Sequence, residues 1–145
     1  MTRIDGGACE DLVCITVTYH PDPTVLVAQL RALPEGSTKL LVDNGTPEPH
    51  WVETLRACEG IDGLQILRMG ANQGLAAAVN AGARHALSQS RWSHVLLLDQ
   101  DSEPAPKAVE RLLQAHAQLA LEQGTPVAVG PALRDPVTGL LHGFH

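Results

Sequence analysis

Short apolar runs alternate with segments of helical pattern along almost the whole of this 145-residue chain. The alternation predicts an α/β protein with a doubly wound, mainly parallel sheet in a three-layer α/β/α arrangement, because parallel neighbours need helical, right-handed crossovers. If the strands are numbered along the chain, their expected spatial order in the sheet is 3-2-1-4, with a fifth strand beyond. No low-complexity linker interrupts the pattern, so residues 1–145 are predicted to form a single domain. The predicted strands are Leu12–Thr18, Lys39–Val42, Leu64–Leu67, Val95–Leu98 and Val127–Val129.

Segments with helical spacing lie between these strands. The third of them is rich in alanine and carries an apolar stripe of Leu75, Val79, Ala83 and Leu87. Ser102 is suited to cap the start of the fourth helix. The predicted helices are Thr24–Leu33, Pro49–Cys58, Leu75–Ser88 and Pro104–Gln123, and a turn is predicted at Asp135–Gly139.

The apolar run 95–98 ends abruptly in two acids, Asp99 and Asp101. Four consecutive apolar residues are typical of a strand buried on both faces of a parallel sheet. In extended backbone the two carboxylates share a face roughly 6.5–7 Å apart. At an effective dielectric constant near 20 they repel by about 2.4 kcal/mol, which favours a bound divalent cation such as Mg²⁺ or Mn²⁺. The alternative is a strand-to-loop junction with two solvated acids and a helix cap.

Polar residues follow each of the first four predicted strands. Parallel strands place these ends on one edge of the sheet, so the side chains are expected to converge on a single ligand. Each group also has a plain structural interpretation: the sequence 43–45 is compatible with a turn, and Asn72 with a helix cap. The residues concerned are Thr18, Tyr19, Asp43, Asn44, Asn72, Gly74, Asp99 and Asp101.

Composition and missing motifs exclude several classes of protein. A net charge of −6 without a basic cluster argues against nucleic acid as a partner. Three cysteines without a Cys-x-x-Cys pair are typical of a reducing compartment, and no signal peptide or run of eighteen apolar residues is present, so a cytoplasmic protein is expected. The dinucleotide fingerprint, the P-loop, the nucleophile elbow and the His-Glu-x-x-His zinc motif are all absent from the sequence.

Four segments together resemble the family-2 inverting glycosyltransferases, which have the GT-A fold. They are Val17–Pro21, Val42–Thr46, Asn72–Gly82 and Leu97–Ser102. The resemblance runs from about Leu12 to Gly139. The Tyr-His-Pro loop and the Asp-Gln-Asp-Ser sequence look most like bacterial rhamnosyltransferases, which use dTDP-rhamnose as donor.

The resemblance implies a role for each of these segments. Thr18 and Tyr19 are expected to border the nucleobase, and Asp43 to accept a hydrogen bond from its imide N–H. Residues 72–74 and the helix that follows, with Asn72, Gly74 and Asn80, are expected to close the pocket for base and ribose. Asp99 is expected to contact the ribose, and Asp101 to bind the Mg²⁺ or Mn²⁺ that bridges the diphosphate and neutralises charge on the leaving group.

The family pattern also implies a catalytic base in an acceptor-binding half, and we expect this base beyond His145. Asp135 is the only acid after Glu122, and its Asp-Pro turn favours a structural role. The chain is therefore expected to be the donor-binding part of an enzyme that acts on a glycan or lipid-linked acceptor, with little transfer activity by itself. Peripheral membrane association of the full-length enzyme stays open.

Two alternatives belong to other classes. A receiver-like or other non-catalytic nucleotide-binding module also ends parallel strands in acids, but a receiver needs adjacent acids after its first strand and a lysine near its fifth. A sugar nucleotidyltransferase needs a glycine-rich, lysine-bearing loop near its N-terminus. The sequence lacks these features.

Overall fold

The computed structural model describes residues 9–124, 127–135 and 137–142. The chain divides into two compact units, with the boundary between Pro104 and Ala105. Within the described residues, no helix has both the length and the apolar character needed to cross a membrane.

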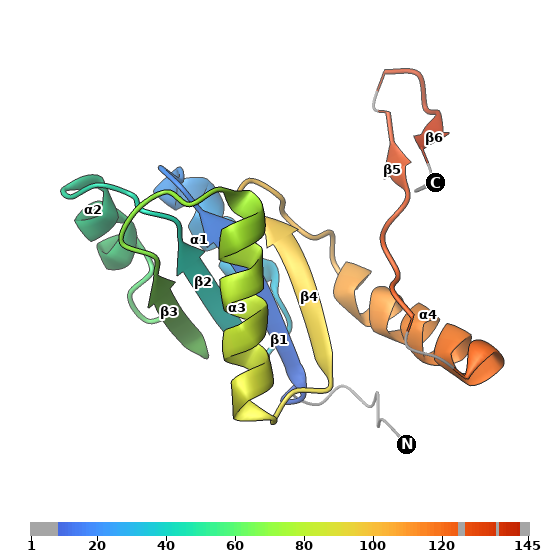
Figure 1. Ribbon diagram of the computed structural model, residues 1–145. Coiled ribbons are helices and arrows are strands. Elements are labelled where there is room, and N and C mark those ends of the chain that lie inside the picture. Colours follow the sequence, from blue (N-terminus) through green and yellow to red (C-terminus); the bar gives the residue numbers. More distant parts are fainter. Residues whose placement is uncertain (1–8, 125–126, 136, 143–145) are drawn as a thin grey trace. The chain divides into compact units, whose positions relative to one another are not determined.

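The first unit is built on a four-stranded parallel sheet with the strand order β3-β2-β1-β4 (Figure 1). This order and the parallel pairing confirm the sequence prediction. The central strands β1 and β2 are almost entirely buried, as their apolar, β-branched composition indicates. The strands are β1 (Leu12–Thr18), β2 (Thr38–Asp43), β3 (Leu64–Arg68) and β4 (His94–Asp99).

Helices cover both faces of this sheet, which confirms the three-layer arrangement. The helix α1 (Pro23–Ala32) is capped by Asp22, whose carboxylate accepts hydrogen bonds from two backbone N–H groups of the first turn. It packs beside α2 (His50–Ala57). The helix α3 (Leu75–Gln89) packs against β1 and β2 on the opposite face.

The predicted apolar stripe of α3 is not its buried face. Ala78, Gly82 and Ala86 are buried, whereas Leu75 is 60% exposed and Leu87 is 75% exposed. Small residues let the helix approach the sheet closely: a Cβ at position 82 would lie 2.9 Å from a methyl group of Ile15. The close approach therefore selects the row of smallest side chains, although another row is more apolar.

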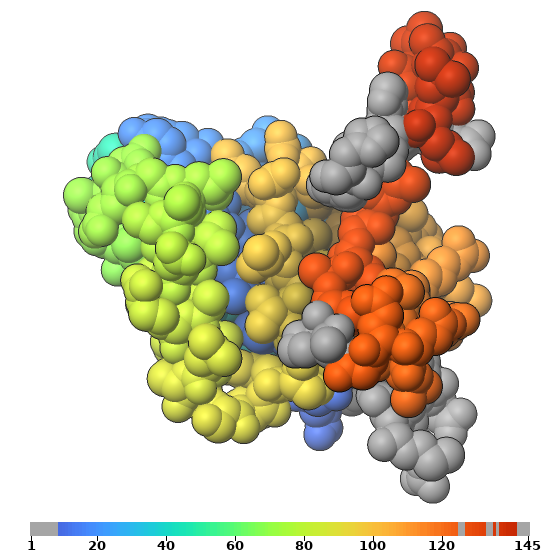
Figure 2. Space-filling model, turned by 45° about the vertical axis from the view of Figure 1, so that its right-hand side comes forward, coloured from blue at the N-terminus to red at the C-terminus, as the bar shows by residue number. Residues whose placement is uncertain are grey.

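The prediction that β4 is buried on both faces was wrong. Its residues alternate between half-buried and exposed, and Val95 and Leu97 are each about half exposed. The strand lies at an edge of the sheet, and α3 covers the neighbouring strands. In Figure 2, β4 (gold) lies open at the surface beside α3 (yellow-green).

The second unit contains α4 (Ala108–Gln123) and an antiparallel pair, β5 (Leu133–Arg134) and β6 (Leu141–His142). The helix begins at Ala108, four residues later than the predicted start at Pro104, and Lys107 rather than Ser102 precedes it. Pro106 explains the delay, because a proline disfavours helical backbone at the residue before it. The predicted turn at Asp135–Gly139 is confirmed by the hydrogen bond from the Gly139 N–H to the Asp135 carbonyl, 2.9 Å long.

The fifth strand predicted at Val127–Val129 is not formed. These residues have no strand assignment, and the Val127 carbonyl accepts a hydrogen bond of 3.0 Å from the Nε2 of His116 on α4. A short apolar run becomes a strand only where a neighbouring strand offers a ladder of backbone groups. In the described part of this unit, the strand pairing involves residues 133–134 and 141–142 instead.

Candidate functional site

The carboxyl ends of the four parallel strands lie at one edge of the sheet, as predicted. The register pairs Thr18 with Asp43, Asp43 with Arg68, and Val17 with Asp99. Because all four strands run in the same direction, the loops that follow them also emerge at this edge. The loops carry the other predicted strand-end residues Tyr19, Asn44, Asn72, Gly74 and Asp101.

Thr18 and Tyr19 differ sharply in their surroundings. The side chain of Thr18 is fully buried, and within the described residues its Oγ1 is a buried polar atom without a hydrogen-bond partner. Such a group is costly to leave unsatisfied, and it lies beside Asp43 in the register. Tyr19 is 43% exposed, and its ring meets the ring of His20 edge-on at 4.5 Å between centroids. Tyr19 therefore offers an aromatic surface at the sheet edge.

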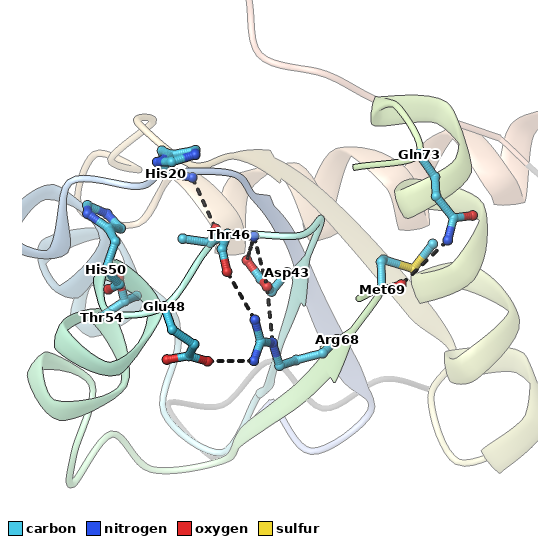
Figure 3. A network of polar contacts seen from close by, with 9 residues as sticks. All are labelled: His20, Asp43, Thr46, Glu48, His50, Thr54, Arg68, Met69 and Gln73. Carbon is cyan, nitrogen blue, oxygen red and sulfur yellow. Dashed lines mark hydrogen bonds and ion pairs between the residues drawn. The ribbon is translucent and has the colours of Figure 1, made fainter. Parts of the chain in front are cut away.

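Asp43 is the most enclosed of the predicted site residues. Its side chain is 0% exposed, and both carboxylate oxygens accept from the backbone N–H of Thr46 at 3.2 Å. The Arg68 Nε donates to Asp43 Oδ2 at 3.3 Å, while the rest of the guanidinium binds Glu48 and the Thr46 carbonyl (Figure 3). The guanidinium also lies 5.0 Å from the ring centroid of Trp51. A ligand at this edge therefore reaches the Asp43 carboxylate only after a local rearrangement.

The loop after β2 is joined to the loop after β3 by two asparagines. Asn44 is buried; its Nδ2 donates to Asn72 Oδ1 at 3.1 Å, and its Oδ1 accepts from the Gln73 N–H at 2.9 Å. Asn72 Oδ1 also accepts from the Gly74 N–H at 2.9 Å, at the start of α3. The N-cap of α3 is Gly74, and no side chain caps the helix, so the predicted helix cap at Asn72 is not formed. The Asn72 side chain is instead one part of a junction between two strand ends.

Gly45 permits this junction. Its φ of +89° is a backbone conformation that other residues rarely adopt, and a Cβ there would lie 2.5 Å from backbone atoms of Ala71 and Asn72. Gly74 also has a positive φ, of +87°, and its missing Cβ would meet nothing within 4 Å. At Gly45 the absence of a side chain serves backbone packing as well as backbone conformation.

Asp99 and Asp101 are both exposed, and the backbone of the turn that carries them is hydrogen-bonded to the helix α1. Gln29, fully buried on α1, donates its Nε2 to the carbonyl oxygens of Asp99 and Ser102, and its Oε1 accepts from Thr16 Oγ1 at 2.8 Å. The two carboxylates therefore face solvent on a supported backbone.

Between the two acids, Gln100 binds the loop after β1. Its Oε1 accepts from the Tyr19 N–H at 2.8 Å, and its Nε2 donates to the Tyr19 carbonyl at 3.2 Å. The acidic turn and the Tyr19 loop are thus directly joined.

Asn80 lies on α3 and its side chain is exposed. Within the described residues, no hydrogen bond or ion pair connects its side chain with the residues at the carboxyl ends of the strands, so its place in a nucleotide pocket stays a prediction.

The carboxylate oxygens at the acidic turn are suitable ligands for a hard divalent cation. Asp99 and Asp101 are solvent-exposed carboxylates, and oxygen ligands are those that Mg²⁺ and Mn²⁺ prefer. In the described part of the chain, no three His, Cys, Asp or Glu side chains are arranged to hold a metal ion by themselves. Mg²⁺ also binds through one or two carboxylates together with substrate phosphates, which is the mode these two acids suit.

Sequence reasoning missed three residues that organise this edge: Gln29, Arg68 and Gln100. A signal for Gln29 was present, because it lies on the same helical face as Leu26, Leu30 and Leu33, where a buried polar group needs partners. Gln100 was visible only as the residue between two acids. Arg68 carried no signal beyond its position at the end of a strand.

These features define an α/β domain whose polar residues gather at the carboxyl ends of its strands, where proteins of this class bind their ligands. The chain belongs to the Glycosyl transferase family 2, whose sequence model matches residues 26–134. The matched region contains Asp43, Asn72, Asp99 and Asp101, whereas Thr18 and Tyr19 precede it. No curated protein matches the chain. Family membership decides against the receiver and nucleotidyltransferase alternatives, and it identifies the chain as a glycosyltransferase domain.

Proposed function

We propose that this domain binds the donor of a glycosyl transfer, a pyrimidine nucleoside diphosphate sugar, with dTDP-rhamnose as the specific candidate. The observation that carries the proposal is the joining of the strand-end loops into one edge: Asn44 links to Asn72, and Gln100 links to Tyr19. A nucleotide sugar is long enough to need a base-binding end and a diphosphate-binding end. This edge offers an exposed aromatic residue after β1 and two exposed acids after the neighbouring strand β4.

At the base-binding end, Tyr19 offers its ring as a surface for the base. Thr18 Oγ1 is an unsatisfied hydroxyl that gains a partner if a base group reaches it, and Asp43 is the acceptor suited to an imide N–H. Asn72, Gly74 and Asn80 are proposed to border the base and ribose. Because Asp43 is covered, a shift of the neighbouring loop accompanies base binding.

At the diphosphate-binding end, Asp99 is proposed to contact the ribose and Asp101 to hold Mg²⁺ or Mn²⁺. When bound, the cation supplies positive charge that offsets the charge developing on the nucleoside diphosphate as it leaves. The Gln29 hydrogen bonds keep the backbone beneath these acids in place, so the carboxylates are oriented before the ligand arrives. The acceptor is proposed to be a glycan or a lipid-linked saccharide, with inversion at the transferred sugar.

Substitution of Asp101 tests the metal-binding role. Asp101→Asn removes one anionic ligand, and we expect calorimetry to show weaker binding of dTDP in the presence of Mn²⁺, by about tenfold. Binding without metal is expected to change little. Asp62→Asn is the matched control, because Asp62 is an exposed acid just before β3, at the opposite edge of the sheet. Equal dTDP affinity in wild type and Asp101→Asn, with and without Mn²⁺, contradicts the assignment.

The base and the sugar are tested by comparing ligands. Thermal shifts with dTDP, UDP and GDP in the presence of Mn²⁺ are expected to be larger for the two pyrimidine nucleotides, because ligand at 100 times its dissociation constant stabilises by about 2.7 kcal/mol. A larger shift with GDP rules out the pyrimidine preference. Competition between dTDP-rhamnose and dTDP-glucose then tests the choice of rhamnose.

A further inference from the structure

The backbone ladder between β1 and β4 ends where the acidic turn begins. The last register pair is Val17 with Asp99. Gln100 is the residue directly after β4. Its side chain makes two hydrogen bonds with the backbone of Tyr19. A side-chain amide has one donor group and one acceptor, so it pairs with a backbone N–H and C=O as a neighbouring strand does. The contact therefore extends the connection between the two strands by one step after the ladder has stopped.

The alternation of half-buried and exposed residues along β4 continues into the turn. Gln100 is partly buried, whereas Asp99 and Asp101 on either side of it are exposed. The residue between the acids acts as an anchor, and the two carboxylates are presented outward. Gln29 holds the same turn from the helix α1, through the carbonyl oxygens of Asp99 and Ser102.

We infer that Gln100 is a positioning residue that couples the Tyr19 loop to the turn carrying Asp101, so that the base-binding and diphosphate-binding ends of the site keep a fixed separation. The inference rests on the proposed function. It predicts a specific consequence: without the Gln100 contact, each end still forms, but metal and nucleotide assist each other less. Coupling between two ligands is a free energy that calorimetry can measure directly.

The test uses the full chain with Gln100→Met and Gln100→Ala. Methionine keeps the length of the side chain and removes both hydrogen bonds, so it separates bonding from volume. The affinity for dTDP is measured by calorimetry with and without Mn²⁺ for each variant. Gln114→Ala, an exposed glutamine of α4, is the control.

We expect the gain in dTDP affinity on adding Mn²⁺ to fall by about tenfold in both Gln100 variants, as for other groups that orient a metal ligand. The affinity without metal is expected to stay within about twofold of wild type, because the base-binding residues are retained. A merely structural role would lower the melting temperature and leave this gain unchanged. Hydrogen exchange of the Tyr19 amide in the ligand-free chain is expected to be faster in the variants.

The outcomes separate the inference from the proposed function. If the wild type gains no affinity for dTDP from Mn²⁺, the proposed function fails and the role of Gln100 fails with it. If the wild type shows the gain and Gln100→Met shows the same gain, the coupling role is overturned while the proposed function stands. Unchanged exchange of the Tyr19 amide also overturns the role, because it shows that the contact does not hold the loop.

Discussion

The guanidinium of Arg68 at the end of β3 lies 3.3 Å from the fully buried carboxylate of Asp43 at the end of β2. Arg68 is 39% exposed, so the cation reaches solvent while its partner does not. The pair joins neighbouring strand ends at the edge that carries the candidate site. Removing the Arg68 cation tests how much the stability of this part of the sheet depends on compensating the buried charge of Asp43.

Arg68→Met should leave Asp43 without its cationic partner while keeping an apolar stem over Trp51. We expect the free energy of unfolding to fall by about 1–3 kcal/mol, because a buried acceptor loses a charged donor. Urea unfolding followed by tryptophan fluorescence measures this, since Trp51 and Trp92 both lie in the first unit. The control Glu48→Gln removes the exposed partner of the same guanidinium, and a change within about 0.5 kcal/mol is expected. Equal effects of the two substitutions would contradict the importance of the buried pair.

Gly45→Ala should destabilise the junction between the loops after β2 and β3. The new Cβ would lie 2.5 Å from backbone atoms of residues 71 and 72, and φ is +89°. We expect a loss of about 2–4 kcal/mol from backbone strain and overpacking together. Gly70→Ala is the matched control, because Gly70 has a φ of +77° and open space around it. It should cost only about 1–2 kcal/mol, and chemical denaturation compares the two. A loss at position 45 no larger than at position 70 would show that the close approach is unimportant.

The Asp135 carboxylate should titrate below its ordinary value of 3.8. Hydrogen bonds from the backbone N–H groups of Thr138 and Val137 lower its pKa, because they favour the ionised form. The contribution of the carboxylate to the turn is therefore present above the unfolded pKa and is lost as the pH falls through the lower folded pKa. Carboxyl chemical shifts measure the midpoint. The amide shifts of Thr138 should follow the same titration and lose it in Asp135→Asn. A midpoint at or above 3.8 would refute the prediction.

Cys14 should be unreactive in the folded chain. Burial raises the pKa of its thiol to about 11, and burial also raises the pKa of Cys58, so neither forms much thiolate near neutral pH. Alkylation with iodoacetamide at pH 8, followed by intact mass, is expected to give at most one label per chain, at the half-buried Cys9. The same treatment in urea should label all three cysteines. Rapid double labelling without denaturant would contradict the burial of these two thiols.

The sequence by itself determined the first four strands, their order and the residues that follow them. Strands such as Leu12–Thr18 are encoded locally, by β-branched and apolar residues bounded by loop-forming ones. The right-handed crossover rule then restricts how such units assemble. The convergence of Asp43 and Asp99 on one edge follows from strand direction alone. The motifs also indicated the glycosyltransferase family.

Only the tertiary structure decided which groups contact one another across that edge. Gln29 and Gln100 bind partners 70 to 81 residues away, and such contacts depend on strand register and helix rotation rather than on local pattern. The buried face of α3 was decided by close packing at Gly82 and not by the apolar character of its residues. The residues of β4 are exposed because β4 is the outermost strand of the sheet. Local residue preferences predict the helices and strands of this fold, but the distances between its loops depend on how segments far apart in the sequence pack together.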